Sequence, residues 1–133
     1  MLRIIGGIVA GIAAVFATTL ILELLAHQLF PVRADGEPLP IGIQLFVVFA
    51  WFAASTIGGV LAGRITGARW AVWVIAIFCA ATGLATVLMF PHPVWMQIAS
   101  VVAPLIGGFA ATHFVTFQAA AAAPAGSDAD AEV

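Results

Sequence analysis

The sequence has very few charged residues. Of its 133 residues only 8% are Asp, Glu, Lys or Arg, and none is lysine. A soluble domain carries about 25% charged residues, so this composition would leave a water-facing surface far too apolar. The four arginines form no basic stripe with interleaved aromatic residues. We therefore expect no nucleic-acid partner.

Cysteine is also scarce. Cys79 stands alone, which excludes an internal disulfide and a metal site built from several thiolates. It lies within an apolar run, where a buried and inert thiol is expected. The sequence contains no Ser-His-Asp set, phosphate-binding loop or paired catalytic carboxylates. We therefore expect neither an enzyme nor a bound cofactor.

Long apolar runs make up most of the chain, which is 64% hydrophobic with a mean hydropathy of +1.19. Each of four runs clears the roughly 20 residues that cross a bilayer core; they cover about residues 4–30, 41–63, 69–90 and 94–117. In lipid, each segment must satisfy its own backbone polar groups, so these runs predict helices. The expected fold is an all-α, four-helix transmembrane bundle with one membrane domain, residues 1–118, and the lipid bilayer as its main partner.

The arginines predict how this bundle is oriented. Arg3, Arg64 and Arg69 flank one side of the predicted bundle, and only Arg33 lies on the other. Cytoplasmic ends of membrane helices collect Lys and Arg, so both termini are expected in the cytoplasm. Residues 119–133 are rich in alanine and then acidic, which predicts a disordered tail.

Glycines recur at helix-packing spacing in three of the four runs. In the first run a GxxxG pair forms a surface that lets another helix backbone approach closely. The second run ends in a similar pattern, and the fourth has a weaker echo of it. We expect packing within one chain rather than a dedicated dimer motif from these residues: Gly7, Gly11, Gly58, Gly59, Gly63 and Gly108.

A carboxylate and an imidazole interrupt the first run. Glu23 and His27 are four residues apart, so they share one face of a helix. Ionisable groups in a membrane-length segment are costly and need a partner, a water-filled cavity or a function. The topology also places Gln44, His92 and Gln97 toward the same, outer side of the bundle. We expect these five polar groups to converge beneath the outer surface.

Three interpretations of this cluster are open. In the first, a neutral Glu23 is a structural hydrogen-bond partner of His27 or His92, since burial raises the pKa of a carboxyl. In the second, Glu23 is the titrating group of a small proton- or cation-coupled transporter that acts as a homo-oligomer. In the third, Glu23 and His27 ligate one metal ion, with His92 as a third ligand.

Three short patterns carry a resemblance to a known group. They are Glu23 and His27 with Pro31 shortly after, the glycines Gly58, Gly59 and Gly63, and the turn Pro91-His92-Pro93 with Trp95. Over about residues 5–112 the chain resembles small uncharacterised bacterial four-helix integral membrane proteins. The resemblance implies a multi-pass protein of the bacterial cytoplasmic (inner) membrane with this outer polar cluster. It carries no activity, so a structural or accessory role is the expectation, and the transporter is the alternative.

Overall fold

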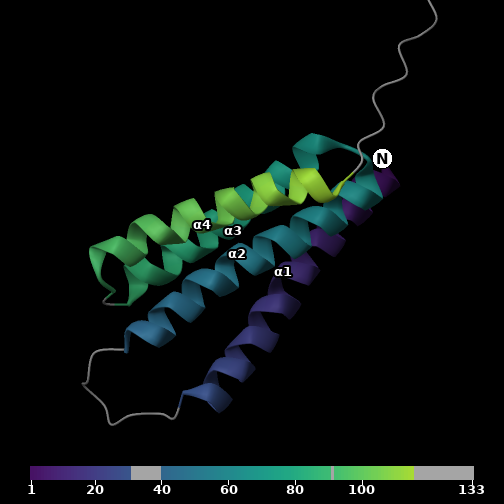
Figure 1. The fold of residues 1–133 in the computed structure, drawn as a ribbon. Helices are drawn as coiled ribbons and strands as arrows, with labels where there is room; N and C mark the ends of the chain where they lie inside the picture. Colours follow the sequence, from purple (N-terminus) through teal and green to yellow (C-terminus); the bar gives the residue numbers. More distant parts are fainter. Residues whose placement is uncertain (31–39, 91, 116–133) are drawn as a thin grey trace, which may run out of the picture.

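The computed structural model describes residues 1–30, 40–90 and 92–115. Within these ranges the chain forms α-helices and no strands: α1 (Leu2–Leu29), α2 (Ile41–Thr66), α3 (Arg69–Met89) and α4 (Val94–Phe114) (Figure 1). All four are long and apolar enough to cross a membrane. The prediction of an all-α fold with four membrane-length helices is thus confirmed. The predicted outer loop with Arg33, and the tail 119–133, lie outside the described residues.

Local sequence sets where the helices end. Gly67 ends α2 in the left-handed conformation, with φ of 69°, which glycine adopts without the steric cost of a Cβ. Its N–H donates to the carbonyl of Gly63 at 2.8 Å. Proline precedes both α2 and α4, at positions 40 and 93, where its fixed φ and missing N–H are tolerated. The short α2–α3 turn makes these two helices antiparallel.

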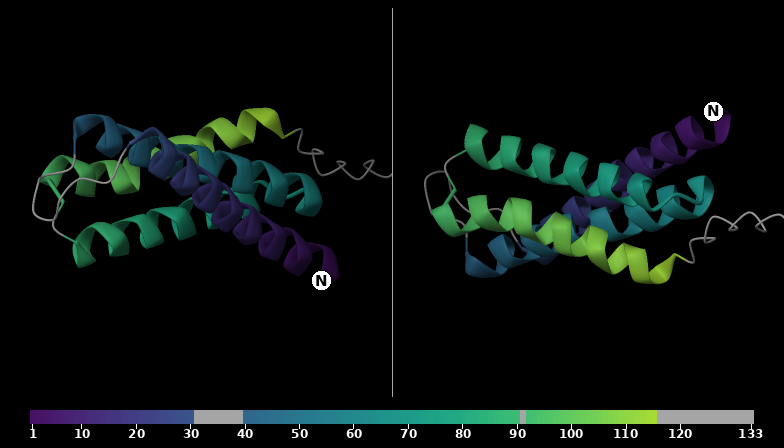
Figure 2. Two further views of the ribbon diagram at one scale, coloured as in Figure 1. Left: turned by 90° about the horizontal axis from the view of Figure 1, so that it is seen from below. Right: turned by 90° about the horizontal axis from the view of Figure 1, so that it is seen from above.

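Helix α2 is the centre of the bundle. It packs against α1, α3 and α4, and α3 also packs against α4. Helix α1 touches α3 only lightly and, within the described ranges, makes no contact with α4. Figure 2 shows why: α1 lies obliquely across the bundle, whereas the other three helices run closer to one common direction. Helix α1 therefore packs mainly on α2, at one side of the bundle.

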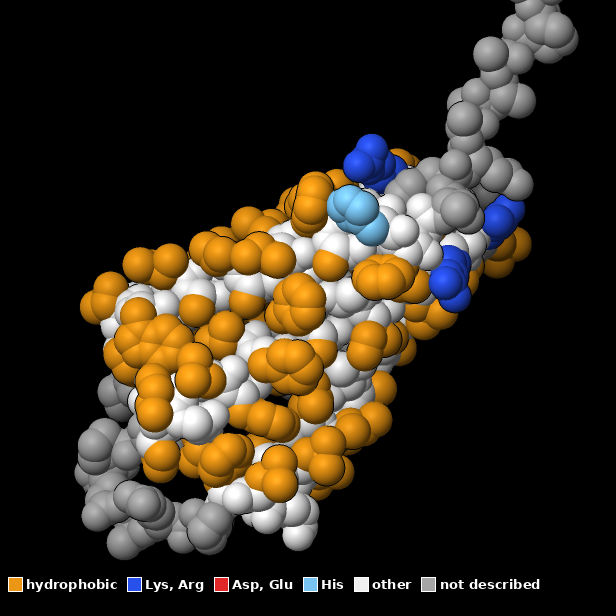
Figure 3. Space-filling model, viewed as in Figure 1, with side chains coloured by type: hydrophobic (Ala, Val, Ile, Leu, Met, Phe, Trp, Pro, Cys, Tyr) orange, Lys and Arg blue, Asp and Glu red, His pale blue; other side chains and the backbone are white. Residues whose placement is uncertain are grey.

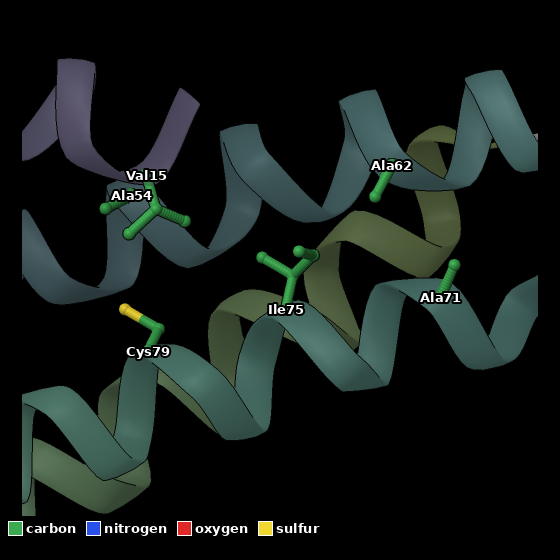
Figure 4. Close-up of a cluster of buried hydrophobic side chains, with 6 residues drawn as sticks. All are labelled: Val15, Ala54, Ala62, Ala71, Ile75 and Cys79. Atoms are coloured by element: carbon green, nitrogen blue, oxygen red, sulfur yellow. The ribbon is translucent and has the colours of Figure 1, made fainter. Parts of the chain in front are cut away.

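Small side chains fill the interior. One cluster joins α1, α2 and α3 around Ile75 and is drawn in Figure 4; its buried members are Val15, Ala54, Ala62, Ala71, Ile75 and Cys79. A second cluster lies nearer the other end of the core and contains Trp51, Val87 and Met96. Alanine and glycine let helix backbones approach closely, which is how membrane helices gain packing energy without a hydrophobic driving force.

The outer surface is apolar along most of its length. Large hydrophobic side chains are exposed on every helix, for example Phe16, Ile57, Ile77 and Ile106. In Figure 3 they are spread over the visible face, while the basic side chains of the described residues gather at one end of the molecule. Apolar groups facing outward all round a bundle are typical of a protein whose surroundings are lipid rather than water.

Candidate functional site

Glu23 and His27 lie on the outside of α1. Both residues are exposed, and after Val15 no residue of α1 is buried. The Nδ1 atom of His27 lies 2.8 Å from the backbone oxygen of Glu23. A carbonyl oxygen can only accept a hydrogen bond, so Nδ1 carries the hydrogen and Nε2 is left for other contacts. Among the described residues, the carboxylate of Glu23 forms no ion pair with a basic side chain.

The other two histidines are held in the same local way. Nδ1 of His92 lies 3.0 Å from the carbonyl oxygen of Phe90, and Nδ1 of His113 lies 3.1 Å from that of Phe109. Each imidazole is thus oriented by a carbonyl two or four residues earlier in the chain. None of the three described hydrogen bonds joins a histidine to the side chain of Glu23.

The five predicted polar residues differ in their exposure. Gln44 at the start of α2, His92 before α4 and Gln97 on α4 are half-buried, whereas Glu23 and His27 are exposed. Because α1 crosses α2 obliquely and does not contact α4 within the described ranges, Glu23 is kept apart from Gln97. No three His, Cys, Asp or Glu side chains in residues 1–30, 40–90 and 92–115 are placed to hold a metal ion.

The six predicted packing glycines are all buried, and their contacts lie within one chain. Gly11 and Gly58 meet backbone to backbone. A Cβ on Gly11 would lie 2.9 Å from the carbonyl oxygen of Gly58, and a Cβ on Gly58 would lie 2.8 Å from that of Gly11. One turn earlier in α1, a Cβ on Gly7 would lie 2.5 Å from the Cγ2 atom of Thr66. The GxxxG pair of α1 is therefore occupied by α2 of the same chain.

Hydroxyl-to-carbonyl hydrogen bonds connect α2 to α4, and sequence reasoning did not find them. Ser55 Oγ donates to the carbonyl of Pro104 at 2.7 Å. Thr56 Oγ1 lies 2.8 Å from the Phe52 carbonyl in its own helix and 3.2 Å from the carbonyl of Gly107 on α4. Gly107 permits this approach, because a Cβ there would lie 2.6 Å from the Phe52 oxygen. The sequence shows the hydroxyl residues of α2 and the proline of α4. Which of them form hydrogen bonds depends on the register between the two helices.

Pro104 also shapes the α3–α4 contact. Proline has no N–H, so the carbonyl of Ser100, four residues earlier, loses its usual helical donor. That oxygen lies against Gly83 of α3, 3.2 Å from where a Cβ would be. The Oγ of Ser100 meanwhile donates to the carbonyl of Gln97 at 2.7 Å. Gly83 thus gives space to a carbonyl that the proline has freed.

Basic side chains and the left-handed turn at Gly67 lie at one end of the bundle. Arg3 donates through Nε to the carbonyl of Ile65 near the end of α2. Nη2 of Arg64 lies 3.5 Å from the carbonyl of Phe114, the last residue of α4. Cations at helix C-termini are favourable, because the last carbonyls lack helical partners and carry partial negative charge. Arg69 opens α3 at the same end.

These features define a small multi-pass membrane protein built from four apolar helices. No known family model, curated protein or solved structure gives a significant match to the chain.

Proposed function

We propose that the chain is an integral protein of the bacterial cytoplasmic membrane with a structural or accessory role, and that both termini face the cytoplasm. Its work would be to hold a stable surface in the bilayer for other membrane components. Glu23 and His27 would then be contact residues on that surface rather than members of an internal pathway.

The nature of the buried polar groups carries this proposal. Among the described residues the buried polar side chains are three hydroxyls, Ser55, Ser100 and Thr112, together with the thiol of Cys79. The three hydroxyls donate to backbone carbonyls of Pro104, Gln97 and Phe109, respectively. Proton and ion pathways in membrane proteins use acidic, basic or histidine side chains that face the bundle interior. Here Glu23, His27 and His113 are exposed and His92 is half-buried, so none of the described ones is fully buried.

The arginine distribution supports the proposed orientation. Arg3 contacts the carbonyl of Ile65 near the end of α2, Arg64 lies at the end of α4, and Arg69 opens α3, so the three arginines gather at one end of the bundle. This is the positive charge pattern that cytoplasmic ends of membrane proteins carry. Trp70 next to Arg69 is half exposed at 49%, which suits an aromatic ring at the interface between lipid and water.

One observation favours the second candidate function, a proton- or cation-coupled transporter that acts as an oligomer. Glu23 and His27 are exposed on one face of α1, so a second subunit against that face would enclose a carboxylate and an imidazole together. A titratable group enclosed between subunits could bind and release protons. The two candidates differ in whether ions cross the bilayer.

Proton flux in proteoliposomes separates them. Purified protein is reconstituted with a pH-sensitive dye inside the vesicles, and a pH gradient or a potassium diffusion potential is imposed. For a structural protein we expect the proton flux to equal that of vesicles without protein. Wild type and Glu23→Gln should then be indistinguishable. A flux above that background that Glu23→Gln abolishes would establish the transporter and overturn the structural proposal.

The same variant has a stability expectation. The Glu23 side chain is exposed and forms no described ion pair, so Glu23→Gln should change the free energy of unfolding in detergent by no more than about 0.5 kcal/mol. Leu20→Gln serves as a matched control, because it also places an amide on the exposed face of α1 one turn earlier.

A further inference from the structure

Three exposed arginines, Arg3, Arg64 and Arg69, form what we call the basic end of the bundle. In residues 1–30, 40–90 and 92–115 the single acidic residue is Glu23, which follows Arg3 by 20 residues. That is about 30 Å of helix at 1.5 Å per residue, well beyond the Debye length of about 8 Å in physiological salt. Helix dipoles add little, because α1 and α3 begin at the basic end and α2 and α4 finish there. The described residues therefore leave the three positive charges unbalanced.

The arginines surround the turn between α2 and α3. Nε of Arg3 donates to a carbonyl near the end of α2, and its Nη2 lies 4.0 Å from where a Cβ on Gly67 would be. Nη2 of Arg64 lies 3.5 Å from the carbonyl oxygen of Phe114. Arg69, on the far side of the turn, forms no hydrogen bond or ion pair within the described ranges. A guanidinium has five N–H donors, so each arginine keeps most of them for a further ligand.

The length of α2 places the basic end among lipid headgroups. Its 26 residues span about 39 Å at 1.5 Å per residue. The hydrocarbon core is about 30 Å thick, and about 40–45 Å with the headgroup layers. Arg64 in the last turn of α2 therefore lies outside the hydrocarbon, at the level of the lipid phosphates. Trp70 beside Arg69 is half exposed, as tryptophans at this interface are.

We propose that the basic end binds anionic phospholipids in preference to zwitterionic ones, through their phosphate groups. This inference rests on the proposed placement of the helices in a bilayer. The planar guanidinium of arginine matches a phosphate with two parallel hydrogen bonds. A zwitterionic headgroup also brings a cation, which three unbalanced arginines repel. An anionic headgroup such as that of phosphatidylglycerol brings only negative charge, so it complements this end of the bundle.

A lipid titration tests the preference. The full chain is purified in a neutral detergent, and its thermal unfolding is followed by near-UV circular dichroism of its four tryptophans. A ligand of the folded state raises the midpoint as its concentration rises. Phosphatidylglycerol should raise it at concentrations where phosphatidylcholine with the same acyl chains does not, and high salt should weaken the effect. Equal shifts with both lipids, or an equal shift with inorganic phosphate alone, would overturn the proposal.

Arg69→Gln locates the effect. This side chain is exposed and has no described bond to lose, so the variant should unfold like wild type without lipid. One basic residue near an anionic lipid surface contributes about fivefold in binding. The variant should therefore need about fivefold more phosphatidylglycerol for the same midpoint shift, and Arg69→Lys should need less than the glutamine variant does.

A charge moved to the opposite end is the matched control. Val94 at the start of α4 is 70% exposed, so Val94→Arg combined with Arg69→Gln restores the net charge away from the basic end. This double variant should behave like Arg69→Gln alone. Full recovery of the lipid effect would show that net charge, and not the basic end, sets the preference, and would overturn the proposal.

The acidic residues after α4 are the competing occupant. They are Asp128, Asp130 and Glu132. A wild type that ignores phosphatidylglycerol, beside a variant that responds once all three are changed to Asn, Asn and Gln, would replace the lipid by this segment of the chain. The titration needs neither membrane orientation nor ion flux. Its failure therefore leaves the structural role and the proposed topology to their own tests.

Discussion

Replacing Gly11 by alanine tests the backbone contact between α1 and α2. A Cβ at this position would lie 2.9 Å from three atoms: the Gly58 carbonyl oxygen, the Ala62 Cβ and the Ile75 Cδ1. The first is backbone and the second is fixed to backbone, so neither can rotate away. Only the end of the Ile75 side chain can move, and it is fully buried.

The size of the effect follows from these distances. Carbon atoms pack at about 3.5–4.0 Å, so α1 must retreat by about 0.5–1 Å, a gap that forfeits a quarter to a half of each dispersion contact it opens. Overpacking of this kind costs about 1–3 kcal/mol. Alanine gains up to about 1 kcal/mol over glycine in helix propensity. With the full propensity gain subtracted, we expect Gly11→Ala to lower the free energy of unfolding by up to about 2 kcal/mol.

Gly6 is the matched control for this change. It lies on the same helix, and a Cβ there would meet nothing within 4 Å. Gly6→Ala should therefore be neutral or stabilising by up to about 1 kcal/mol. Unfolding by SDS in mixed micelles, followed by far-UV circular dichroism, measures both variants against wild type. If Gly11→Ala resists SDS as well as Gly6→Ala does, the close backbone contact between α1 and α2 is refuted.

Three further expectations concern the core and the topology. Ser55→Ala removes the 2.7 Å hydrogen bond to the Pro104 carbonyl and should destabilise the bundle by about 0.6–1.7 kcal/mol in the same unfolding assay; no change would show that the bond contributes nothing. Cys79 is only 2% exposed, so a maleimide should label it in SDS but not in the folded protein. In a Cys79→Ala background, an impermeant reagent should label a new cysteine at Gly36 in intact cells and leave one at Ser127 unlabelled; the reverse would invert the orientation.

The four helices could be predicted from the sequence because each of them is a long apolar run. A run of about 20 apolar residues identifies a spanning helix without knowledge of its neighbours, and the prolines at 40 and 93 mark where helices begin. The predicted end of the second helix at residue 63 fell short of Thr66. Glycine at 67, not the glycine at 63, ends the helix, because the left-handed turn comes there.

The candidate site could be read only in part. The four-residue spacing of Glu23 and His27 predicts that they share one face of α1. The direction in which that face points depends on how α1 is inclined to its neighbours. That inclination is set by the Gly11–Gly58 contact, whose register no single helix encodes. For the same reason the Ser55–Pro104 bond was not predictable, since it joins residues 49 positions apart. The convergence of the five polar residues at the outer end stays a prediction, because it depends on the register and inclination of several helices at once.

The central position of α2 has a consequence for how the protein is made. Helix α1 leaves the ribosome first, yet the surface that it packs on, around Gly58 and Ala62, lies in the second half of α2. The contact that fixes α4 involves Ser55 and Thr56, in that same half. At a synthesis rate of about 5–20 residues per second, α1 therefore waits in the membrane on the order of seconds before its partner is inserted. Until the second half of α2 is inserted, α1 is therefore held in lipid by its own hydrophobicity alone.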